Sequence, residues 1–300
     1  MRKIKSAAAL LLAAALCVGV FAVSAAANSA PEAQNLEFET CRGVSFGGQL
    51  SAVDPDGDTL TYSITTQPVK GSVDLQKDGK FVYTPDSGRK GKDYFGYKAS
   101  DNQGNISQEG TVIIKIGRKA AVTYSDMSGS PDYLNAVMLA QNGIFTGAKV
   151  GETYLFEPDR QVSRGEFLSM CMELSGVKAL EGVVSTGFTD DADIPSWEKA
   201  SVSTALMNGY VQGYTENGLA VFGSQRTITM AEASVMLNKT AGFADVACPE
   251  NGTAPTWAAQ SVANLSSVSV ISDGDQLSDQ LTRAQAAEML VSALTAMKNK

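Results

Sequence analysis

The second half of the chain contains one pattern three times: Val162-Ser163-Arg164-Gly165-Glu166-Phe167, Ile228-Thr229-Met230-Ala231-Glu232-Ala233 and Leu281-Thr282-Arg283-Ala284-Gln285-Ala286. In each copy a Ser or Thr is followed three residues later by Glu or Gln. This is the capping-box spacing, in which two side chains satisfy backbone N–H groups that a helix start leaves free. Apolar residues then follow at helical spacing. We therefore predict three similar amphipathic helices, and a repeat of this kind decides the architecture.

Each of these stretches is the second half of a longer unit. An aromatic-x-Asp sequence opens the three units: Tyr124-Ser125-Asp126, Phe188-Thr189-Asp190 and Phe243-Ala244-Asp245. A first helix is indicated by a proline near its start and, in two units, by an Asn-Gly pair at its end: Pro131, Pro195, Pro255, Asn142-Gly143 and Asn208-Gly209. A short loop with Gly147 or Gly213 then leads to the capped helix. Such helix–loop–helix units cannot bury a core alone, so we expect an all-α bundle of three units with pseudo-threefold symmetry.

Residues 28–117 are predicted to form an all-β domain. Apolar and polar residues alternate from Leu50 to Ile116, which is the period of strands with one buried face. Turn-forming sequences such as Asp54-Pro55-Asp56-Gly57-Asp58 separate these runs. Roughly seven short strands in about 90 residues favour a β-sandwich.

The remaining boundaries follow from composition. Residues 1–27 have the pattern of a secretory signal peptide, in which Arg2, Lys3 and Lys5 precede an apolar run and a small-residue cleavage site. An uncleaved membrane anchor is the alternative, and no other stretch is apolar and long enough to span a bilayer. The predicted organisation is a signal peptide at 1–27, a sandwich at 28–117, a linker at 118–123, and units at 124–179, 180–242 and 243–300.

Charge and residue usage restrict the possible functions. The chain of 300 residues has a net charge of −8, and an acidic chain argues against general nucleic-acid binding. It contains no histidine, which removes the usual general base and the commonest metal ligand. Outside the leader the cysteines are Cys41, Cys171 and Cys248, too few for a disulfide framework. Cys171 and Cys248 could form one bridge, and buried free thiols are the other interpretation.

The β segment resembles the Ig-like or cadherin-like modules of secreted bacterial proteins. The resemblance is carried in order by Asp54-Pro-Asp-Gly-Asp58-Thr-Leu-Thr-Tyr62, Gly71-Ser-Val73, Phe81-Val-Tyr83-Thr-Pro85, Asp93-Tyr-Phe95-Gly-Tyr97 and Ser100-Asp101. It implies a spacer or an adhesive unit. Four side chains here have the oxygen ligands that Ca²⁺ prefers: Asp54, Asp56, Asp58 and Asp101. Their alternative role is to make turns, in which Asp and Asn are common.

Residues 122–297 resemble the S-layer homology family. The carrying residues are Phe188-Thr-Asp190, Trp197, Gly209-Tyr-Val-Gln-Gly213-Tyr214 and Ile228-Thr-Met-Ala-Glu232, with partial copies before and after. The resemblance implies a spindle of helices that binds secondary wall polysaccharides, often pyruvylated, without covalent chemistry and with no cofactor. It implies grooves between units lined by Arg164, Arg283, Asp126, Asp190, Asp245, Trp197, Trp257, Gly147 and Gly213.

A physical mechanism agrees with this implication. A pyruvyl ketal carries a carboxylate, and the N-terminus of a helix is a natural anion site. Arg164 and Arg283 stand at first helical positions, where a guanidinium can add a bidentate grip. Met230 stands at the corresponding position of the second unit, so one groove lacks its cation. We therefore expect one or two working grooves in a secreted protein of the cell wall or S-layer.

Simpler roles remain open for these residues. Arg164 and Arg283 could be solvated surface cations, Trp197 and Trp257 could pack at helix starts, and the three Asp residues could cap the helices that follow. Two other functions are also open: a calcium-dependent adhesion or spacer protein whose repeats are only a scaffold, and a wall-glycan hydrolase with paired carboxylates. No nucleophile motif such as G-x-S-x-G is present, which disfavours the enzyme.

Overall fold

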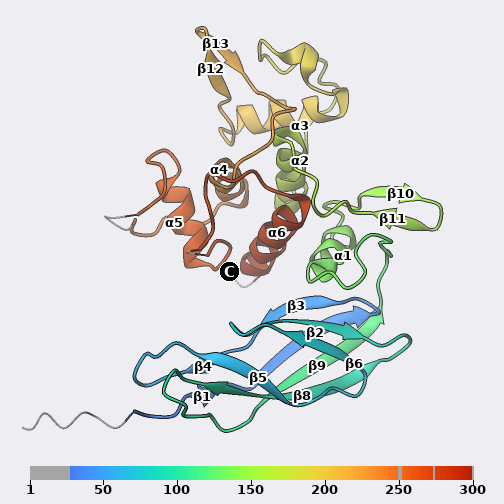
Figure 1. The fold of residues 1–300 in the computed structure, drawn as a ribbon. Helices are drawn as coiled ribbons and strands as arrows, with labels where there is room; N and C mark the ends of the chain where they lie inside the picture. Colours follow the sequence, from blue (N-terminus) through green and yellow to red (C-terminus); the bar gives the residue numbers. More distant parts are fainter. Residues whose placement is uncertain (1–27, 249–251, 273, 299–300) are drawn as a thin grey trace, which may run out of the picture.

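A computed structural model describes residues 28–248, 252–272 and 274–298. The predicted signal peptide lies outside these residues. Figure 1 shows two parts, a β-sandwich formed by the N-terminal third and a helical part formed by the rest of the chain. The two parts lie against each other, with helix α1 next to strand β3.

The sandwich confirms the predicted all-β domain. Its larger sheet has the order β2-β9-β8-β5, its smaller sheet the order β3-β7-β6, and β1 pairs with β4. Strands β2 and β9 are parallel, and the other pairs are antiparallel. The strands are β1 (Glu32–Ala33), β2 (Leu36–Arg42), β3 (Phe46–Gln49), β4 (Ala52–Val53), β5 (Thr61–Thr66), β6 (Gly71–Leu75), β7 (Lys80–Pro85), β8 (Gly91–Ser100) and β9 (Gly110–Lys119).

Aromatic side chains from both sheets form the sandwich core. Phe46, Phe81, Tyr83, Phe95 and Tyr97 are all almost completely buried. Phe81 packs edge to face against Phe95, with ring centroids 5.3 Å apart, a geometry that adds to the gain from burying the rings. This core extends to Ile116 of β9, so the sandwich is a unit with its own hydrophobic interior.

The three capping boxes form as predicted. Ser163 and Glu166 exchange hydrogen bonds at the start of one helix, and Thr229 and Glu232 do so at the start of another. Thr282 and Gln285 make the same reciprocal pair. The helices are α1 (Tyr133–Gln141), α2 (Arg164–Ser175), α3 (Ser196–Met207), α4 (Met230–Ala241), α5 (Ala259–Ser267) and α6 (Arg283–Lys298), with a 3-10 turn at Asp191–Asp193.

A closed ring of backbone hydrogen bonds joins the starts of the capped helices. The N–H of Val162 donates to Leu281 (2.9 Å), that of Leu281 to Ile228 (3.0 Å), and that of Ile228 to Val162 (3.1 Å). The three residues occupy the same position before their caps. Around this ring α2 packs on α3, α4 on α5, and α6 on α1, so each capped helix packs against the first helix of the next unit.

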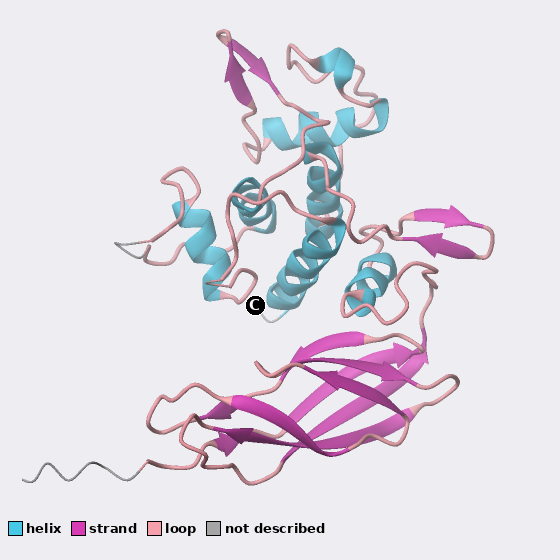
Figure 2. Ribbon diagram, in the orientation of Figure 1, coloured by secondary structure: helices cyan, strands magenta, loops and turns pink. Residues whose placement is uncertain are grey.

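The prediction of an all-α bundle of three repeats is wrong. Two β-hairpins interrupt the helices, formed by β10 (Ala148–Val150) with β11 (Thr153–Leu155) and by β12 (Tyr214–Glu216) with β13 (Leu219–Val221). Figure 2 shows both hairpins projecting from the helical part. The described residues of the last unit contain no hairpin.

A local signal explains the second hairpin. Asn217 and Gly218 have φ angles of 51° and 80°. A two-residue hairpin turn needs positive φ angles at both positions to match the right-handed twist of the paired strands. The three residues before this pair are matched with the three residues after it in a short antiparallel ladder. The helical periodicity on either side of this segment is stronger, and it predicts only a connecting loop here. The helical part is therefore a mixture of helices and strands.

The sandwich and the helical part are joined by contacts as well as by the chain. Gly47 of β3 donates a backbone hydrogen bond to Pro131 (2.8 Å), and the hydroxyl of Ser45 donates to Ser130 (2.9 Å). Val44 is buried among residues of the helical core, and Leu134 of α1 packs on the sandwich core. Strand β9 also continues to Lys119, two residues into the predicted linker.

The structure also shows the state of the cysteines and the character of the helices in the described residues. Cys41, Cys171 and Cys248 are free thiols, with Cys171 buried and Cys248 exposed, so the bridge between the last two is not formed. None of the helices described has both the length and the hydrophobicity needed to cross a bilayer.

Candidate binding groove

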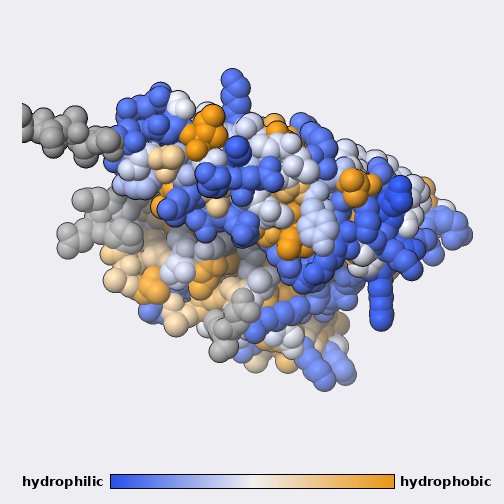
Figure 3. All heavy atoms as spheres, turned by 90° about the horizontal axis from the view of Figure 1, so that it is seen from below, coloured by the Kyte–Doolittle hydropathy of each residue, from blue (hydrophilic) through white to orange (hydrophobic). Residues whose placement is uncertain are grey.

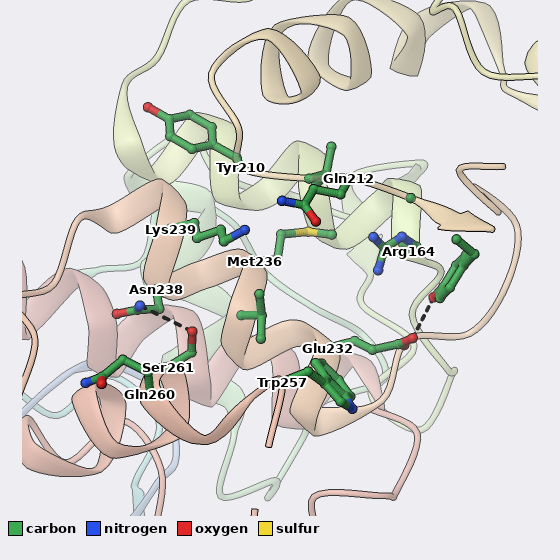
Figure 4. Close-up of a pocket in the computed structure, with 14 residues that line it drawn as sticks. Arg164, Tyr210, Gln212, Glu232, Met236, Asn238, Lys239, Trp257, Gln260 and Ser261 are labelled. Carbon is green, nitrogen blue, oxygen red and sulfur yellow. Dashed lines mark hydrogen bonds between the residues drawn. The ribbon is translucent and has the colours of Figure 1, made fainter. Parts of the chain in front are cut away.

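A groove of about 700 Å³ opens between the second and third helical units. The loop Tyr210–Tyr214 and helix α4 form one side, Trp257 and the first turn of α5 form another, and Arg164 of α2 closes the end. Figure 4 shows Arg164, Lys239 and Trp257 around this space, each from a different element. The groove therefore joins three of the predicted site residues, namely Arg164, Gly213 and Trp257.

Arg164 is a buried cation that has no ionic partner among the residues described. Its side chain retains only 9% of its exposure, and its guanidinium carbon lies 4.8 Å from the ring centre of Tyr214 and 5.3 Å from that of Phe222. No carboxylate of the described residues lies within ion-pair distance of it, and its buried Nε has no hydrogen-bond partner. Removing a charge from water is costly unless the charge is paired. A bound anion would therefore stabilise this buried guanidinium.

The start of helix α2 does not itself offer free donors. The N–H of Arg164 donates to Arg226, that of Gly165 donates to Ser224, and that of Glu166 donates to the Ser163 hydroxyl. The expectation that free N–H groups at the helix start would hold the anion is therefore wrong. Two of these N–H groups bond to the neighbouring unit and the third bonds to the cap, so the side chain of Arg164 is left as the candidate anion-binding group.

Polar groups line the remainder of the groove. Lys239 adds a second positive charge, while Glu232 is engaged by the Tyr214 hydroxyl (2.5 Å) and by the N–H of Thr229 (3.1 Å). Burial, together with the hydrogen bond to Glu232, raises the pKa of Tyr214 to about 12, so Tyr214 is a neutral donor. The net charge of the side chains lining the groove is +1, opposite in sign to the chain as a whole.

Trp257 gives the groove an aromatic wall. Its side chain is 61% exposed, which is unusual for a residue that would otherwise serve only as packing. An exposed indole face is suited to stacking on the apolar face of a sugar ring. Trp197 is also 61% exposed, but it stands next to α2 rather than in this groove.

Gly213 shapes the backbone behind the groove, and Gly147 occupies the equivalent position in the first unit. Gly213 has a φ of +73°, and a Cβ there would lie 2.6 Å from the carbonyl oxygen of Val221. Gly147 has a φ of +80°, and a Cβ there would lie 2.3 Å from the carbonyl oxygen of Leu155. Only glycine fits both restrictions, so these residues set the path of the loop.

Arg283, the other predicted cation, has internal partners. Its Nη1 donates to the carbonyl oxygen of Phe156 (2.6 Å) and to the carboxylate of Glu157 (2.9 Å), and its Nη2 lies 3.8 Å from Glu166. Its guanidinium carbon also lies 4.9 Å from the ring centre of Phe145. The two arginines thus occupy equivalent helix positions and differ in their partners. The third equivalent position is Met230, which carries no charge.

Two of the three predicted Asp residues brace the backbone, and the third holds a side chain. Asp126 accepts from the N–H groups of Phe156 and Glu157, and Asp190 accepts from those of Phe222 and Gly223. Asp245 accepts from the side-chain amide of Asn264 (2.9 Å). None of them lines the groove at Arg164. Their contacts account for the repeated aromatic-x-Asp sequence.

The predicted calcium residues lie at one end of the sandwich. Asp54 accepts from the N–H groups of Asp56 and Asp58, and Asp101 accepts from Gln103, Asn105 and Asn28. The described residues contain no group of three or more acidic or Cys side chains placed to hold a metal ion. Calcium binding stays a prediction, which melting of this protein with and without calcium would test.

Sequence reasoning missed Tyr214 as the aromatic support of Arg164, Lys239 as a second cation, and Glu157 as the partner of Arg283. A signal for them exists. Residues 142–174 and 208–240 correspond without a gap at a separation of 66 residues, as Gly147 and Gly213 show. Comparing the two segments position by position pairs Glu157 with Gly223 and Glu173 with Lys239, so the first unit carries carboxylates where the second has a glycine and a lysine.

The fold defines a multidomain protein, a sandwich followed by a helical part that contains the candidate groove. Residues 28–118 match the family model described as bacterial cadherin-like domain, and residues 123–168 match the model described as S-layer homology domain. The chain therefore carries a bacterial cadherin-like domain followed by an S-layer homology domain, and it is a wall-anchored protein of the cell surface. Both modules are non-catalytic surface or anchoring units.

A curated relative matches part of the chain. The chain is 25% identical over 131 residues to the surface-layer 125 kDa protein of Lysinibacillus sphaericus. The matched part covers 43% of this chain and 11% of that protein. The chain therefore spans only a small fraction of the length of this relative.

Similar solved structures include an endo-fucoidan hydrolase of glycoside hydrolase family 107, with 17% identity over 31% of this chain and 14% of that chain, and a TM-score of 0.26. Another is the SrpA adhesin of Streptococcus sanguinis, with 16% identity over 32% of this chain and 66% of that chain, and a TM-score of 0.23. Similarities this low carry no argument about function.

Proposed function

We propose that the helical part holds the protein on the bacterial wall by binding an acidic, pyruvylated wall polysaccharide in the groove at Arg164, while the sandwich is displayed outside. The binding is non-catalytic. The observation that carries this proposal is the buried Arg164 guanidinium, which has aromatic support and no carboxylate partner among the described residues.

The chemistry of the groove matches one ligand class. A ketal carboxylate would pair with Arg164, a sugar face would lie on Trp257, and Lys239 would attract further negative charge along the polymer. An ion pair with a guanidinium is strongest when it is bidentate and shielded from water. The burial of Arg164 supplies that shielding.

The charge of the whole chain works against a purely electrostatic attraction. Residues 120–300 have a net charge of −10, so an anionic polymer is repelled at long range. The local charge of the groove has the opposite sign, so binding depends on short-range contacts. A repeating polymer offers many such contacts, and several protein copies on one strand would gain avidity.

The test is retention on purified cell wall by the intact chain. Arg164→Met copies a residue that the protein already tolerates at the equivalent position, Met230, so the fold is preserved. We expect at least about a tenfold loss of affinity, because one charge-assisted pair contributes roughly 1.5–3 kcal/mol. Arg283→Met is the matched control and should retain binding, because Glu157 already pairs with Arg283.

The ligand class is tested with the same wall preparation after mild acid removes the pyruvyl ketals. Binding should fall to the level of Arg164→Met. Equal retention on intact and stripped wall would contradict the proposal. The non-catalytic role is tested by incubating the chain with wall glycan, from which no new reducing ends should appear.

A further inference from the structure

The groove at Arg164 has a counterpart in the region around Arg283, called here the groove at Arg283, which has the same backbone hydrogen bonds. The N–H of Arg164 donates to Arg226 and that of Gly165 to Ser224, while the N–H of Arg283 donates to Arg160 and that of Ala284 to Pro158. The two acceptor pairs are themselves 66 residues apart, so they occupy equivalent positions. The two regions therefore have the same pattern of backbone hydrogen bonds, and the differences between them arise from side chains.

One difference lies directly at the cation. Both units have a phenylalanine here, Phe222 or Phe156. The residue after it is Gly223 in the groove at Arg164 and Glu157 in the groove at Arg283. Both residues have a positive φ, 70° for Gly223 and 57° for Glu157. Glutamate rarely adopts this conformation, so the chain places a carboxylate at a backbone position that favours glycine. That carboxylate lies 2.9 Å from the Arg283 guanidinium.

A second difference also makes the groove at Arg283 more negative. Lys239 of α4 lines the open groove, and the equivalent residue of α2, 66 positions earlier, is Glu173. A tryptophan, in contrast, is kept at the equivalent position, because Trp197 follows Pro195 as Trp257 follows Pro255, with equal exposure. Gly147 matches Gly213, and Glu166 matches Glu232. The groove at Arg283 thus retains its backbone frame, a tryptophan and the cation; it differs in carrying two added carboxylates and in having Ala148 in place of Tyr214.

We infer that the Glu157 carboxylate occupies the position at Arg283 that a ligand carboxylate takes at Arg164, so that the chain has one open and one self-occupied acidic-sugar groove. This inference rests on the proposed function. Glu157 is then a specificity-determining residue that sets the number of polysaccharide sites at one. The chain is monovalent although its sequence repeats the motif.

Binding can be followed at each arginine separately by NMR of the intact ¹⁵N-labelled chain. The side-chain Nε–H signals of Arg164 and Arg283 are assigned with the Arg164→Met and Arg283→Met variants. The probe is a methyl hexoside that carries a pyruvyl ketal, and the same hexoside without the ketal is the control. In the natural chain the probe should shift the Arg164 signal and leave the Arg283 signal unchanged.

The decisive variant is Glu157→Gly, which copies Gly223 and relieves the positive φ. The probe should now shift both signals, with dissociation constants within about tenfold of each other. Adding Glu173→Lys should tighten the new site further, since it restores the charge found at Lys239. Glu157→Gln keeps the side chain, removes its charge and should open the site only in part.

The outcomes separate the inference from the proposed function. A shift at Arg164 but none at Arg283 in Glu157→Gly and in the double variant would overturn the inference and leave the proposed function standing. A shift of Arg283 in the natural chain equal to that of Arg164 would also overturn it. No shift at Arg164 in any of the proteins would contradict the proposed function and the inference together. Unchanged thermal unfolding of each variant confirms that the fold is intact.

Discussion

The carboxylate of Asp190 accepts a hydrogen bond of 2.8 Å from the backbone N–H of Gly223, 33 residues further along the chain. Its other oxygen accepts from Phe222 at 2.9 Å. One side chain thus fixes the end of the hairpin to the opening turn of the same unit. Because Gly223 stands beside the Arg164 groove, this brace positions a groove without contacting its ligand.

We expect Asp190→Asn to destabilise the protein by about 1–3 kcal/mol, because the amide has one acceptor and would turn its NH₂ group toward the second backbone N–H. Chemical denaturation measures this change. Asp193→Asn alters the same charge in the adjacent turn. Asp193 is exposed and its carboxylate accepts no hydrogen bond from the described residues, so this substitution should be neutral. Equal effects of the two substitutions would show that charge, and not bracing, is responsible.

Gly213→Ala should cost more than Gly209→Ala. Both residues have a positive φ, about 70°, where alanine is strained. At Gly209 a Cβ meets nothing within 4 Å, whereas at Gly213 it approaches Phe188 and the Val221 carbonyl oxygen at 2.6 Å. We expect roughly 1 kcal/mol for the first site from the backbone alone and a clearly larger loss for the second. Thermal unfolding of both variants checks the difference.

Trp257→Ala and Trp197→Ala form a matched pair, because both side chains are 61% exposed. Neither substitution should change the melting temperature by more than a few degrees. Wall binding should weaken about fivefold or more for Trp257→Ala, the one that lines the open groove. Trp197→Ala should bind as the natural chain does. Loss of binding in both would indicate that the groove at Arg283 is open.

The ion pair between Asp191 and Lys199 should give the stability a pH dependence. The hydrogen bond from Lys199, with two from Thr186, lowers the pKa of Asp191 to about 2, below the value of about 4 for an unfolded chain. A lowered folded pKa stabilises the protein above pH 4, and this stability is lost as the pH falls from about 4 to about 2. Lys199→Met should therefore lower the melting temperature at pH 7 and differ less from the natural chain near pH 2. A constant difference across this range would contradict the assignment.

Much of the fold could be predicted from local sequence. The capping boxes at Ser163, Thr229 and Thr282 act within four residues, so their spacing alone is sufficient evidence. The sandwich likewise follows from period-two alternation and turn residues. The hairpin at Asn217-Gly218 was missed, although its turn signal is as local as the caps, because a strong helical pattern on both sides led to a loop interpretation.

The partners of the two arginines could not be predicted in this way. Arg164 and Arg283 have similar neighbours in sequence, yet their environments are formed by residues 50 or more positions away, Tyr214 in one case and Glu157 in the other. Gly165 is a similar example. It looks like any small residue after a cap, but a side chain there would collide with Glu198 of the next unit. Such requirements arise only when the units pack together.

Figure 3 views the molecule from the side of the sandwich, where hydrophilic residues cover much of the surface and separate its hydrophobic residues into small groups. On the opposite side of the sandwich, Gly47 bonds to Pro131, and Val44 is buried with the helical core. A pull on the outer end of the sandwich is therefore transmitted to the wall-bound part through two parallel connections, strand β9 and this seam. The direction of the displayed sandwich is therefore set by its interface with the helical part as well as by the connecting chain.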